Sequence, residues 1–210
     1  MKNSSINFRY YLITNRKAPD KRSLLETVER ACKAGVRAVQ LREKDMTDKS
    51  LVALGKKMRS ITNEYNTRLF VNRRADIAQL LDADGVHCPE NGIPPMAIKS
   101  SWPKLTVGMS VHSKKAAKRA EKEGADFLLF GPVYYTASKA KYGDPQGINK
   151  LKEVAEQFSV PVFAVGGITP EKVDPCLQAG AFGVAGISAV MKADNVVQQV
   201  NSFKEHLGQL

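Results

Sequence analysis

The sequence predicts an α/β protein, a closed (β/α)8 (TIM) barrel that forms one domain over residues 1–210. Three observations support this. Short apolar segments of β-type recur along the chain, segments with helical periodicity lie between most of them, and no segment has the composition of a domain linker. Alternating strands and helices indicate a parallel sheet, and nearly continuous apolar strands indicate burial on both faces.

Eight apolar runs rich in Val, Ile, Leu and Phe are expected to be the strands. Because the loops between them are short, the eight units favour a closed barrel. An open doubly wound sheet of eight strands is the alternative. In chain order the runs cover residues 9–13, 36–41, 69–71, 84–87, 105–109, 126–130, 160–165 and 182–187.

The first helix is expected over SLLETVERACKAG, residues 23–35. Ser23 can cap its start with Glu26 three residues later, and Gly35 can end it. Its apolar face consists of Leu24, Leu25, Val28, Ala31 and Cys32. The same passage from helix end through a glycine or acidic residue to a strand returns as KAGVRAVQL, LDADGVHC, EKEGADFLLF and QAGAFGVAG. This recurrence indicates a repeated βα unit.

The composition argues against a membrane protein and against a nucleic-acid-binding protein. The chain is 43% apolar and 25% charged, and no stretch approaches the ~18 to 20 apolar residues of a membrane span, so we expect a cytoplasmic protein. The net charge of +11 is spread over expected helix faces and interleaved with Glu, which favours a solvated basic surface over a nucleic-acid site. Such a surface attracts anionic substrates. The three cysteines lack ligand spacing and are expected to be reduced and structural.

The active sites of (β/α)8 barrel enzymes lie at the C-terminal ends of the strands. The residues directly after the apolar runs are cations, amides and hydroxyls. They suit a phosphorylated ligand, because Arg and Lys supply charge while amides and hydroxyls orient it. These residues are Thr14, Asn15, Gln40, Arg42, Glu43, Lys44, Asn72, Arg73, His87, Ser110, His112, residues 131–139, Gly166, Gly167 and residues 186–189.

Two glycine-containing turns follow the last two expected strands. Gly166 and Gly167 end the seventh, and Gly186-Ile187-Ser188-Ala189 ends the eighth. Barrels commonly bind phosphate at this place through backbone N–H groups and the start of a short helix. A tight turn that needs positive φ is the structural alternative for either turn alone. Their occurrence on adjacent strand ends favours the phosphate site.

Several motifs carry a family resemblance, in unbroken order over nearly the whole chain. They are QLREK (40–44), VNRRADIA (71–78), DGVH (84–87), GMSVHS (108–113), GADFLLFGPVYYTASK (124–139), VPVFAVGGITPEKV (160–173) and AGAFGVAGISAV (179–190). The chain resembles the thiamine-phosphate synthase family, which includes the TenI-like thiazole tautomerases. The resemblance implies a (β/α)8 barrel that binds 4-methyl-5-(2-hydroxyethyl)thiazole phosphate. Synthases join it to hydroxymethylpyrimidine diphosphate with Mg²⁺ and loss of pyrophosphate, and tautomerases aromatise a thiazole phosphate carboxylate.

The resemblance also implies substrate contacts. It places the pyrimidine and the diphosphate near the second to fifth strands, and the thiazole and its phosphate near the last three. The implied residues are Gln40, Arg42 and Lys44 for the pyrimidine and diphosphate, Asn72 and Ser110 for the diphosphate, Thr136, Ser138 and Lys139 for the thiazole and pyrophosphate, and Gly167, Ile187 and Ser188 for the thiazole phosphate.

The departures from the family pattern concern metal and acid–base groups. Synthases carry metal-binding aspartates where this chain has Arg73 and Gly92, and Mg²⁺ prefers oxygen ligands, so we expect no metal and no cofactor, with Mg²⁺ only if the synthase alternative holds. Glu90, Asn91 or Arg73 are left open as replacements. Tautomerases carry a histidine where this chain has Pro132. His112 and, second, Lys139 are then the candidate catalytic residues.

Three hypotheses follow. The first is a TenI-like, metal-independent thiazole tautomerase, the second a thiamine-phosphate synthase with an altered Mg²⁺ site, and the third a non-catalytic thiazole-phosphate-binding regulatory protein. The expected partner is a small phosphorylated substrate, without nucleic acid or membrane, and a homodimer is left open. Structural alternatives are an Arg42–Glu43 ion pair, a solvated Lys44, a packed His87 and a structural role for His112.

Overall fold

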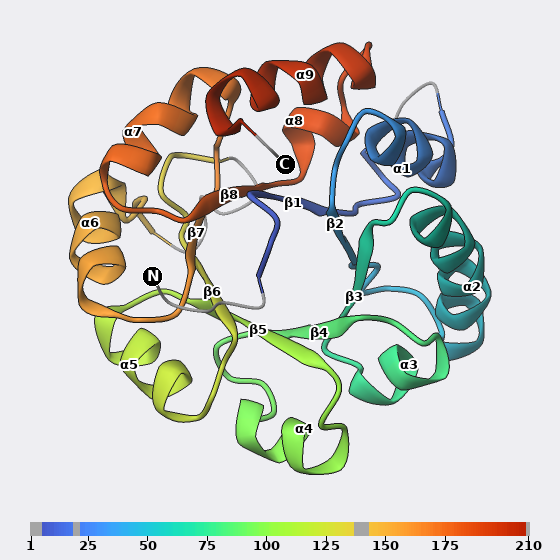
Figure 1. The fold of residues 1–210 in the computed structure, drawn as a ribbon, viewed down its shortest axis with the longest axis horizontal. Coiled ribbons are helices and arrows are strands. Elements are labelled where there is room, and N and C mark those ends of the chain that lie inside the picture. The colour runs from blue at the N-terminus through green and yellow to red at the C-terminus, as the bar shows by residue number, and fades with distance from the viewer. Residues whose placement is uncertain (1–5, 19–21, 137–142, 209–210) are drawn as a thin grey trace.

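The computed structural model describes residues 6–18, 22–136 and 143–208. Within these ranges the strands close into one parallel barrel in sequence order, with the first strand paired to the eighth (Figure 1). The strands are β1 (Tyr10–Ile13), β2 (Ala38–Leu41), β3 (Arg68–Asn72), β4 (Gly85–Cys88), β5 (Thr106–Val111), β6 (Phe127–Phe130), β7 (Val162–Val165) and β8 (Gly183–Gly186). Each lies within two residues of an expected apolar run, so the barrel prediction is confirmed and the open sheet is excluded.

Helices surround the ring of strands (Figure 1). They are α1 (Leu24–Lys33), α2 (Asp48–Glu64), α3 (Ala75–Leu80), α4 (Pro95–Ser101), α5 (Lys114–Lys122), α6 (Gly147–Gln157), η2 (Pro170–Lys172), α7 (Val173–Gln178), α8 (Ser188–Met191) and α9 (Val196–Leu207). The predicted cap of α1 is confirmed, because the Ser23 side chain accepts a hydrogen bond from the Glu26 N–H at 3.1 Å. Gly35 follows the helix with φ of +114°. No described helix is long and apolar enough to cross a membrane.

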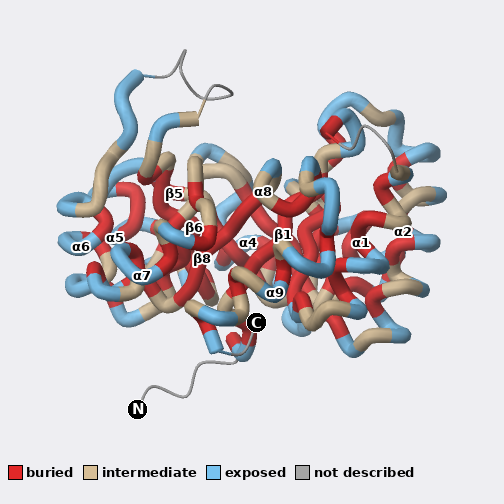
Figure 2. The backbone as a smooth tube through the Cα atoms, turned by 90° about the horizontal axis from the view of Figure 1, so that it is seen from above, coloured by how far each residue is buried: buried red, intermediate tan, exposed pale blue. Residues whose placement is uncertain are grey.

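The buried side chains form two layers. In Figure 2 the segments that carry buried residues are the red parts of the backbone, and they lie mainly in the interior. The larger layer lies between the strands and the helices and includes Val28, Val39, Met58 and Phe203. The smaller one fills the barrel itself. Alternate residues of a strand face opposite sides of the sheet. Leu12 therefore belongs to the outer layer, and its neighbours Tyr11 and Ile13 belong to the inner one.

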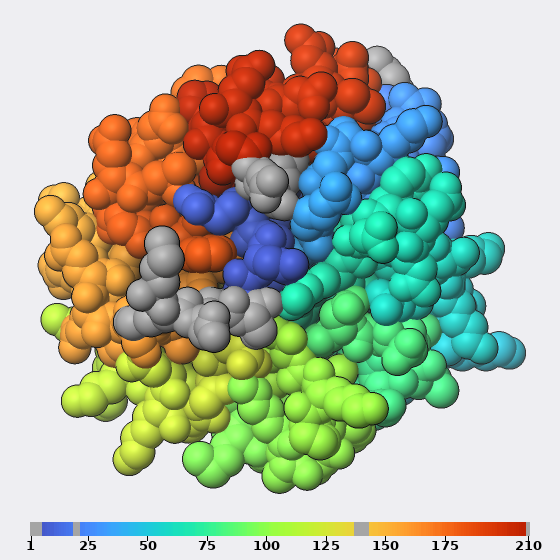
Figure 3. All heavy atoms as spheres, in the orientation of Figure 1, coloured from blue at the N-terminus to red at the C-terminus, as the bar shows by residue number. Residues whose placement is uncertain are grey.

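Aromatic side chains close the N-terminal end of the barrel. Phe8, which precedes β1, is fully buried, and its ring centroid lies 5.3–5.8 Å from those of Tyr11, Phe70, Phe127 and Phe163. In Figure 3 the first described residues, in blue, lie at the centre of this face. The barrel is therefore packed rather than hollow. A ligand can reach its interior-facing residues only from the other, C-terminal end.

Candidate active site

Glu43 joins the ends of β1 and β2 at the C-terminal face. Its carboxylate is buried and accepts a hydrogen bond from the Thr14 hydroxyl at 2.7 Å and from the Arg16 backbone N–H at 3.1 Å to each oxygen. The same Thr14 oxygen accepts the Arg42 backbone N–H at 2.9 Å. The suggested Arg42–Glu43 ion pair is therefore wrong for the described residues. Glu43 instead fixes the backbone from which Arg42 projects.

Gln40 lies near the end of β2, and Arg42 and Lys44 follow the strand at the C-terminal end of the barrel. The Arg42 guanidinium is half-buried, and this burial lowers its pKa, although nearby Glu43 opposes the change. Gln40 is buried and donates from Nε2 to the Tyr11 hydroxyl at 3.3 Å. Lys44 is exposed. A half-buried cation in an arrangement of this kind is stabilised by an anionic ligand.

His87 lies inside the barrel, as expected of a packed and hydrogen-bonded residue. Its Nε2 is 2.9 Å from the Ser110 hydroxyl oxygen, across the β4–β5 pair. Burial, reinforced by the positive charge of Arg42, lowers the pKa of His87 to about 3. Gly108 makes room for the ring, since a Cβ there would lie 2.6 Å from His87 Nδ1. His87 is thus neutral at physiological pH.

The tautomer of His87 follows from its partners. Nδ1 is buried without a hydrogen-bond partner in the described structure. An unpaired buried N–H is rarer and costlier than an unpaired acceptor, so the single ring proton belongs on Nε2, where it is donated to Ser110. The Ser110 hydroxyl then keeps its own proton for another acceptor. Half-buried Ser110 can offer that proton to a ligand at the mouth.

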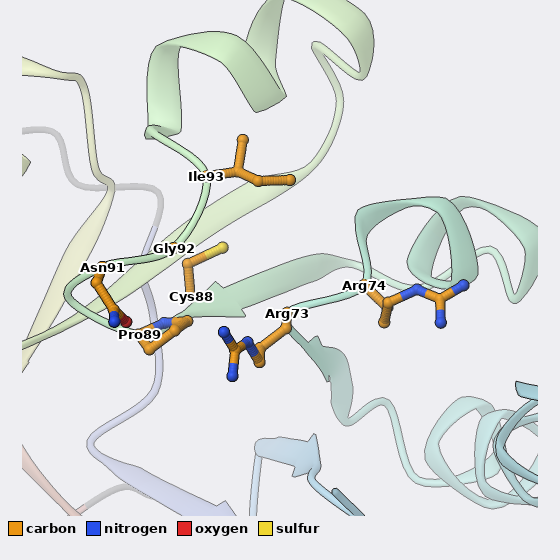
Figure 4. A pocket seen from close by; sticks show the side chains of 7 residues that line it. All are labelled: Arg73, Arg74, Cys88, Pro89, Asn91, Gly92 and Ile93. Atoms are coloured by element: carbon orange, nitrogen blue, oxygen red, sulfur yellow. The ribbon is translucent and has the colours of Figure 1, made fainter. Parts of the chain in front are cut away.

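An open cavity of about 490 Å³ lies between the ends of β3 and β4 (Figure 4). It is lined by Arg73, Arg74, Cys88, Pro89, Asn91, Gly92 and Ile93. Figure 4 shows the Arg73 side chain extending toward Pro89 and Asn91, whereas Arg74 extends away from them. Half-buried Asn72 ends β3 beside this cavity, directly across from His87 in the register. Cationic and amide groups from two strand ends therefore meet here.

Mg²⁺, which the resemblance implies, does not fit the described residues at this mouth. No group of three His, Cys, Asp or Glu side chains that could hold an ion exists in the described ranges. The Glu43 carboxylate already accepts from Thr14 and Arg16, and the Glu90 carboxylate accepts the His112 N–H at 2.9 Å. The cavity lining contributes two guanidinium groups and no carboxylate, and Mg²⁺ prefers carboxylate oxygens and water.

His112 follows β5 and is exposed at the same end of the barrel. Its Nδ1 hydrogen-bonds the Gly131 carbonyl oxygen after β6, and a carbonyl only accepts, so Nδ1 carries a proton. Nε2 is left as the ring position that can take up or release a second proton. The geometry therefore keeps His112 available as an acid or base, and its role stays a prediction.

The glycine turn after β7 packs directly against the segment that follows β6, which gives its glycines a structural reason apart from phosphate binding. Gly166 and Gly167 have φ of +99° and +66°, and a Cβ at Gly167 would lie 2.5 Å from the Tyr135 carbonyl oxygen. A Cβ at Gly166 would meet Pro132 at 2.6 Å. The missing side chains thus make room for the segment after β6. A phosphate role would be additional to this packing.

The second turn of the expected phosphate site follows β8. Ile187 precedes α8, and Ser188 is its first residue, so the Ser188 N–H has no partner within the helix. Lys172, which the sequence interpretation missed, donates from Nζ to the Gly167 carbonyl at 3.0 Å and lies 4.7 Å from the Tyr134 ring centroid. Its position in GGITPEK, five residues after the glycine, is the only sequence signal for this contact.

The structure brings most of the expected site residues to one end of the barrel. Thr136 is described and half-buried, and Ser138 and Lys139 lie outside the described residues. The sequence identifies Thr14 and Glu43 only as strand-end residues, and no sequence signal shows that they bond to each other across 29 positions.

Comparison with known proteins identifies the family. The sequence profile described as thiamine monophosphate synthase matches residues 10–190. The chain belongs to this family. It is 47% identical to a putative thiamine-phosphate synthase 2 from Aquifex aeolicus over 88% of this chain and 98% of that protein. A thiamine-phosphate synthase from Clostridium novyi is 38% identical over 91% of this chain and 94% of that protein.

A solved structure agrees with this assignment. A thiamine phosphate pyrophosphorylase from Pyrococcus furiosus matches with a TM-score of 0.87 at 33% identity, over 96% of both chains. The chain is therefore an enzyme of the thiamine monophosphate synthase family, which takes part in thiamine biosynthesis. The relatives' names favour the synthase hypothesis over the tautomerase that the sequence interpretation placed first.

Proposed function

We propose that this chain is a thiamine-phosphate synthase, which couples hydroxymethylpyrimidine diphosphate to thiazole phosphate. The observation that carries the proposal is the presence of two separate groups of anion-binding character at one barrel end. Arg42 directly follows β2, Asn72 ends β3 and Ser110 lies in β5, whereas the turns at Gly167 and Ser188 follow β7 and β8. Two phosphorylated substrates need two such groups, and a reaction on one thiazole phosphate needs only one.

The chemistry of the coupling fits the side chains at the mouth. A carbon–nitrogen bond forms between the pyrimidine methylene and the thiazole nitrogen, while the bond from that methylene to the diphosphate oxygen breaks and pyrophosphate leaves with the electron pair. No proton has to be moved. Catalysis then depends on donors that stabilise negative charge on the leaving oxygens. Arg42 and the Ser110 hydroxyl, with its proton free, supply donors of this kind.

The test is a coupling assay with purified protein, hydroxymethylpyrimidine diphosphate and thiazole phosphate, with thiamine phosphate and pyrophosphate both quantified. We expect the two products in equal amounts. Ser110→Ala should lower kcat by about 10-fold or more, the scale for losing a donor to developing charge. Ser100→Ala, on exposed α4, is the matched control and should leave kcat unchanged. Absence of thiamine phosphate from the wild-type reaction would refute the proposal.

A thiazole tautomerase is the second candidate, and His112 is the observation that favours it. Proton transfer on a ring carbon needs a group that can both accept and return a proton. His112 Nε2, which has no hydrogen-bond partner in the part of the chain that the structure describes, offers this at the mouth, next to the segment that begins at Gly131. The same assay with thiazole phosphate carboxylate as sole substrate distinguishes the two candidates, because only a tautomerase converts it without a pyrimidine.

A further inference from the structure

We propose that Arg73 binds the diphosphate group in the β3–β4 cavity and that this binding requires no divalent cation. The inference deepens the proposed synthase function and rests on it for the identity of the natural ligand. Its physical basis is the mismatch between the cavity and a metal ion. The cavity carries the positive charge of the protein itself, in the side chains of Arg73 and Arg74.

The two arginines of the cavity differ in what they contact. Arg74 forms ion pairs with Asp76 at 2.7 Å and with Asp48, so its charge is already balanced. For the Arg73 guanidinium, no ion pair or hydrogen bond exists among the described residues, and the side chain is exposed. Arg73 is therefore the cation of this cavity that is available to a ligand.

The backbone holds Arg73 in an unusual conformation. Its φ is +66°, which costs a non-glycine residue about 1 kcal/mol or more. The Arg73 N–H donates to the His87 carbonyl at 2.9 Å, so the neighbouring strand fixes the turn. The turn separates Arg73 from Arg74 and extends the first toward Asn91 across the cavity (Figure 4).

The chemistry of the lining selects a multiply charged oxyanion. A guanidinium offers a planar fork of N–H donors that matches phosphate oxygens in pairs. The Asn91 amide can donate from the opposite side of the cavity, and half-buried Arg42 lies on the adjacent strand end, near enough to act on His87. A diphosphate can meet two such cations at once, whereas a single phosphate group meets fewer donors.

The same lining disfavours a metal ion. Mg²⁺ holds near-ideal octahedral oxygen coordination and is bound by carboxylates. Here the cavity presents a guanidinium that repels the ion and an asparagine as its one side-chain oxygen donor among the lining residues. A Cβ at Gly92 would lie 2.9 Å from the Pro89 ring, so the backbone at this position also leaves little space for a longer ligand side chain.

The test is calorimetric titration of the purified protein with inorganic pyrophosphate, in EDTA and separately with millimolar Mg²⁺. We expect binding in EDTA that Mg²⁺ does not strengthen. Arg73→Met should raise the Kd for pyrophosphate by about 10-fold or more, the equivalent of losing a charge-assisted hydrogen bond. Arg68→Met is the matched control, because Arg68 starts the same strand at the opposite end of the barrel, and it should leave Kd unchanged.

A second variant separates charge from folding. Arg73→Gly suits the positive φ, so it should unfold at no lower temperature than the wild type and still lose pyrophosphate binding. Binding that needs Mg²⁺, or an Arg73→Met variant that binds as tightly as the wild type, would overturn the inference. Because the titration requires no turnover, its result is independent of the coupling assay. A failed coupling with intact pyrophosphate binding would refute the synthase and leave the anion site standing.

Discussion

Nε2 of His87 and the hydroxyl oxygen of Ser110 lie 2.9 Å apart, and this hydrogen bond links β4 to β5 beneath the mouth of the barrel. The ring is neutral because its pKa is lowered to about 3, whereas an unfolded histidine titrates near 6.5. Below pH 6.5 the unfolded chain therefore binds a proton that the folded chain does not. Stability should be lost as pH falls from about 6.5 toward 3.

The first prediction measures this loss. Between pH 7 and pH 5 the His87 contribution should lower the free energy of unfolding by up to about 2 kcal/mol. His87→Gln, which does not titrate in this range, should show a shallower decline in urea unfolding. His206→Gln removes a partly exposed histidine that pairs with Asp174 and serves as the control. Equal pH slopes for wild type and His87→Gln would show that His87 is not the cause.

The second prediction concerns the glycine turn after β7. Gly167→Ala adds a Cβ 2.5 Å from the Tyr135 carbonyl at a φ of +66°. Gly124→Ala adds one at a φ of +84° with no atom within 4 Å. Both variants carry backbone strain of about 1 kcal/mol, and only Gly167→Ala adds a clash. Thermal unfolding should therefore show the larger loss for Gly167→Ala, together with weaker binding of thiazole phosphate. Equal losses would mean that the segment after β6 moves aside without cost.

The third prediction concerns the buried carboxylate that joins β1 and β2. Glu43→Gln replaces an acceptor oxygen by an amide and leaves either the Thr14 hydroxyl or the Arg16 N–H poorly paired, which should cost about 1–3 kcal/mol. Asp45→Asn changes an exposed carboxylate that contacts Arg16 and Lys17, and it should cost clearly less than Glu43→Gln because solvent screens exposed ion pairs. Urea unfolding gives both values. A Glu43→Gln variant as stable as Asp45→Asn would contradict this role.

The fourth prediction separates the two candidate reactions at one residue. His112→Asn removes the imidazole ring and keeps a polar side chain. Coupling moves no proton, so its kcat should stay within a few-fold, whereas a tautomerase turnover should fall by ~10²-fold or more. Both rates are measured on the same preparation, with thiamine phosphate and the aromatic thiazole product quantified separately. A ~10²-fold loss of coupling would assign His112 to the synthase reaction instead.

The sequence was sufficient to predict the barrel and to bring most candidate site residues to one end of it. Periodicity and strand composition locate buried parallel strands, and Ser23 with Glu26 forms a local cap that spacing alone predicts. The Thr14–Glu43 contact was not predictable, because it joins two loops across 29 positions. Gly166 and Gly167 were interpreted as ligand contacts, although their nearest neighbours are Pro132 and Tyr135. The opposite directions of Arg73 and Arg74 depend on a positive φ that no residue type signals.

The aromatic packing around Phe8 affects how ligands enter and leave. With one end of the barrel filled by the protein's own rings, entry and exit share a single opening. Both substrates of the proposed synthase would enter through this opening, and neither could leave through the opposite end. Steady-state kinetics should therefore be sequential, because both substrates have to be bound over this one opening before either product leaves.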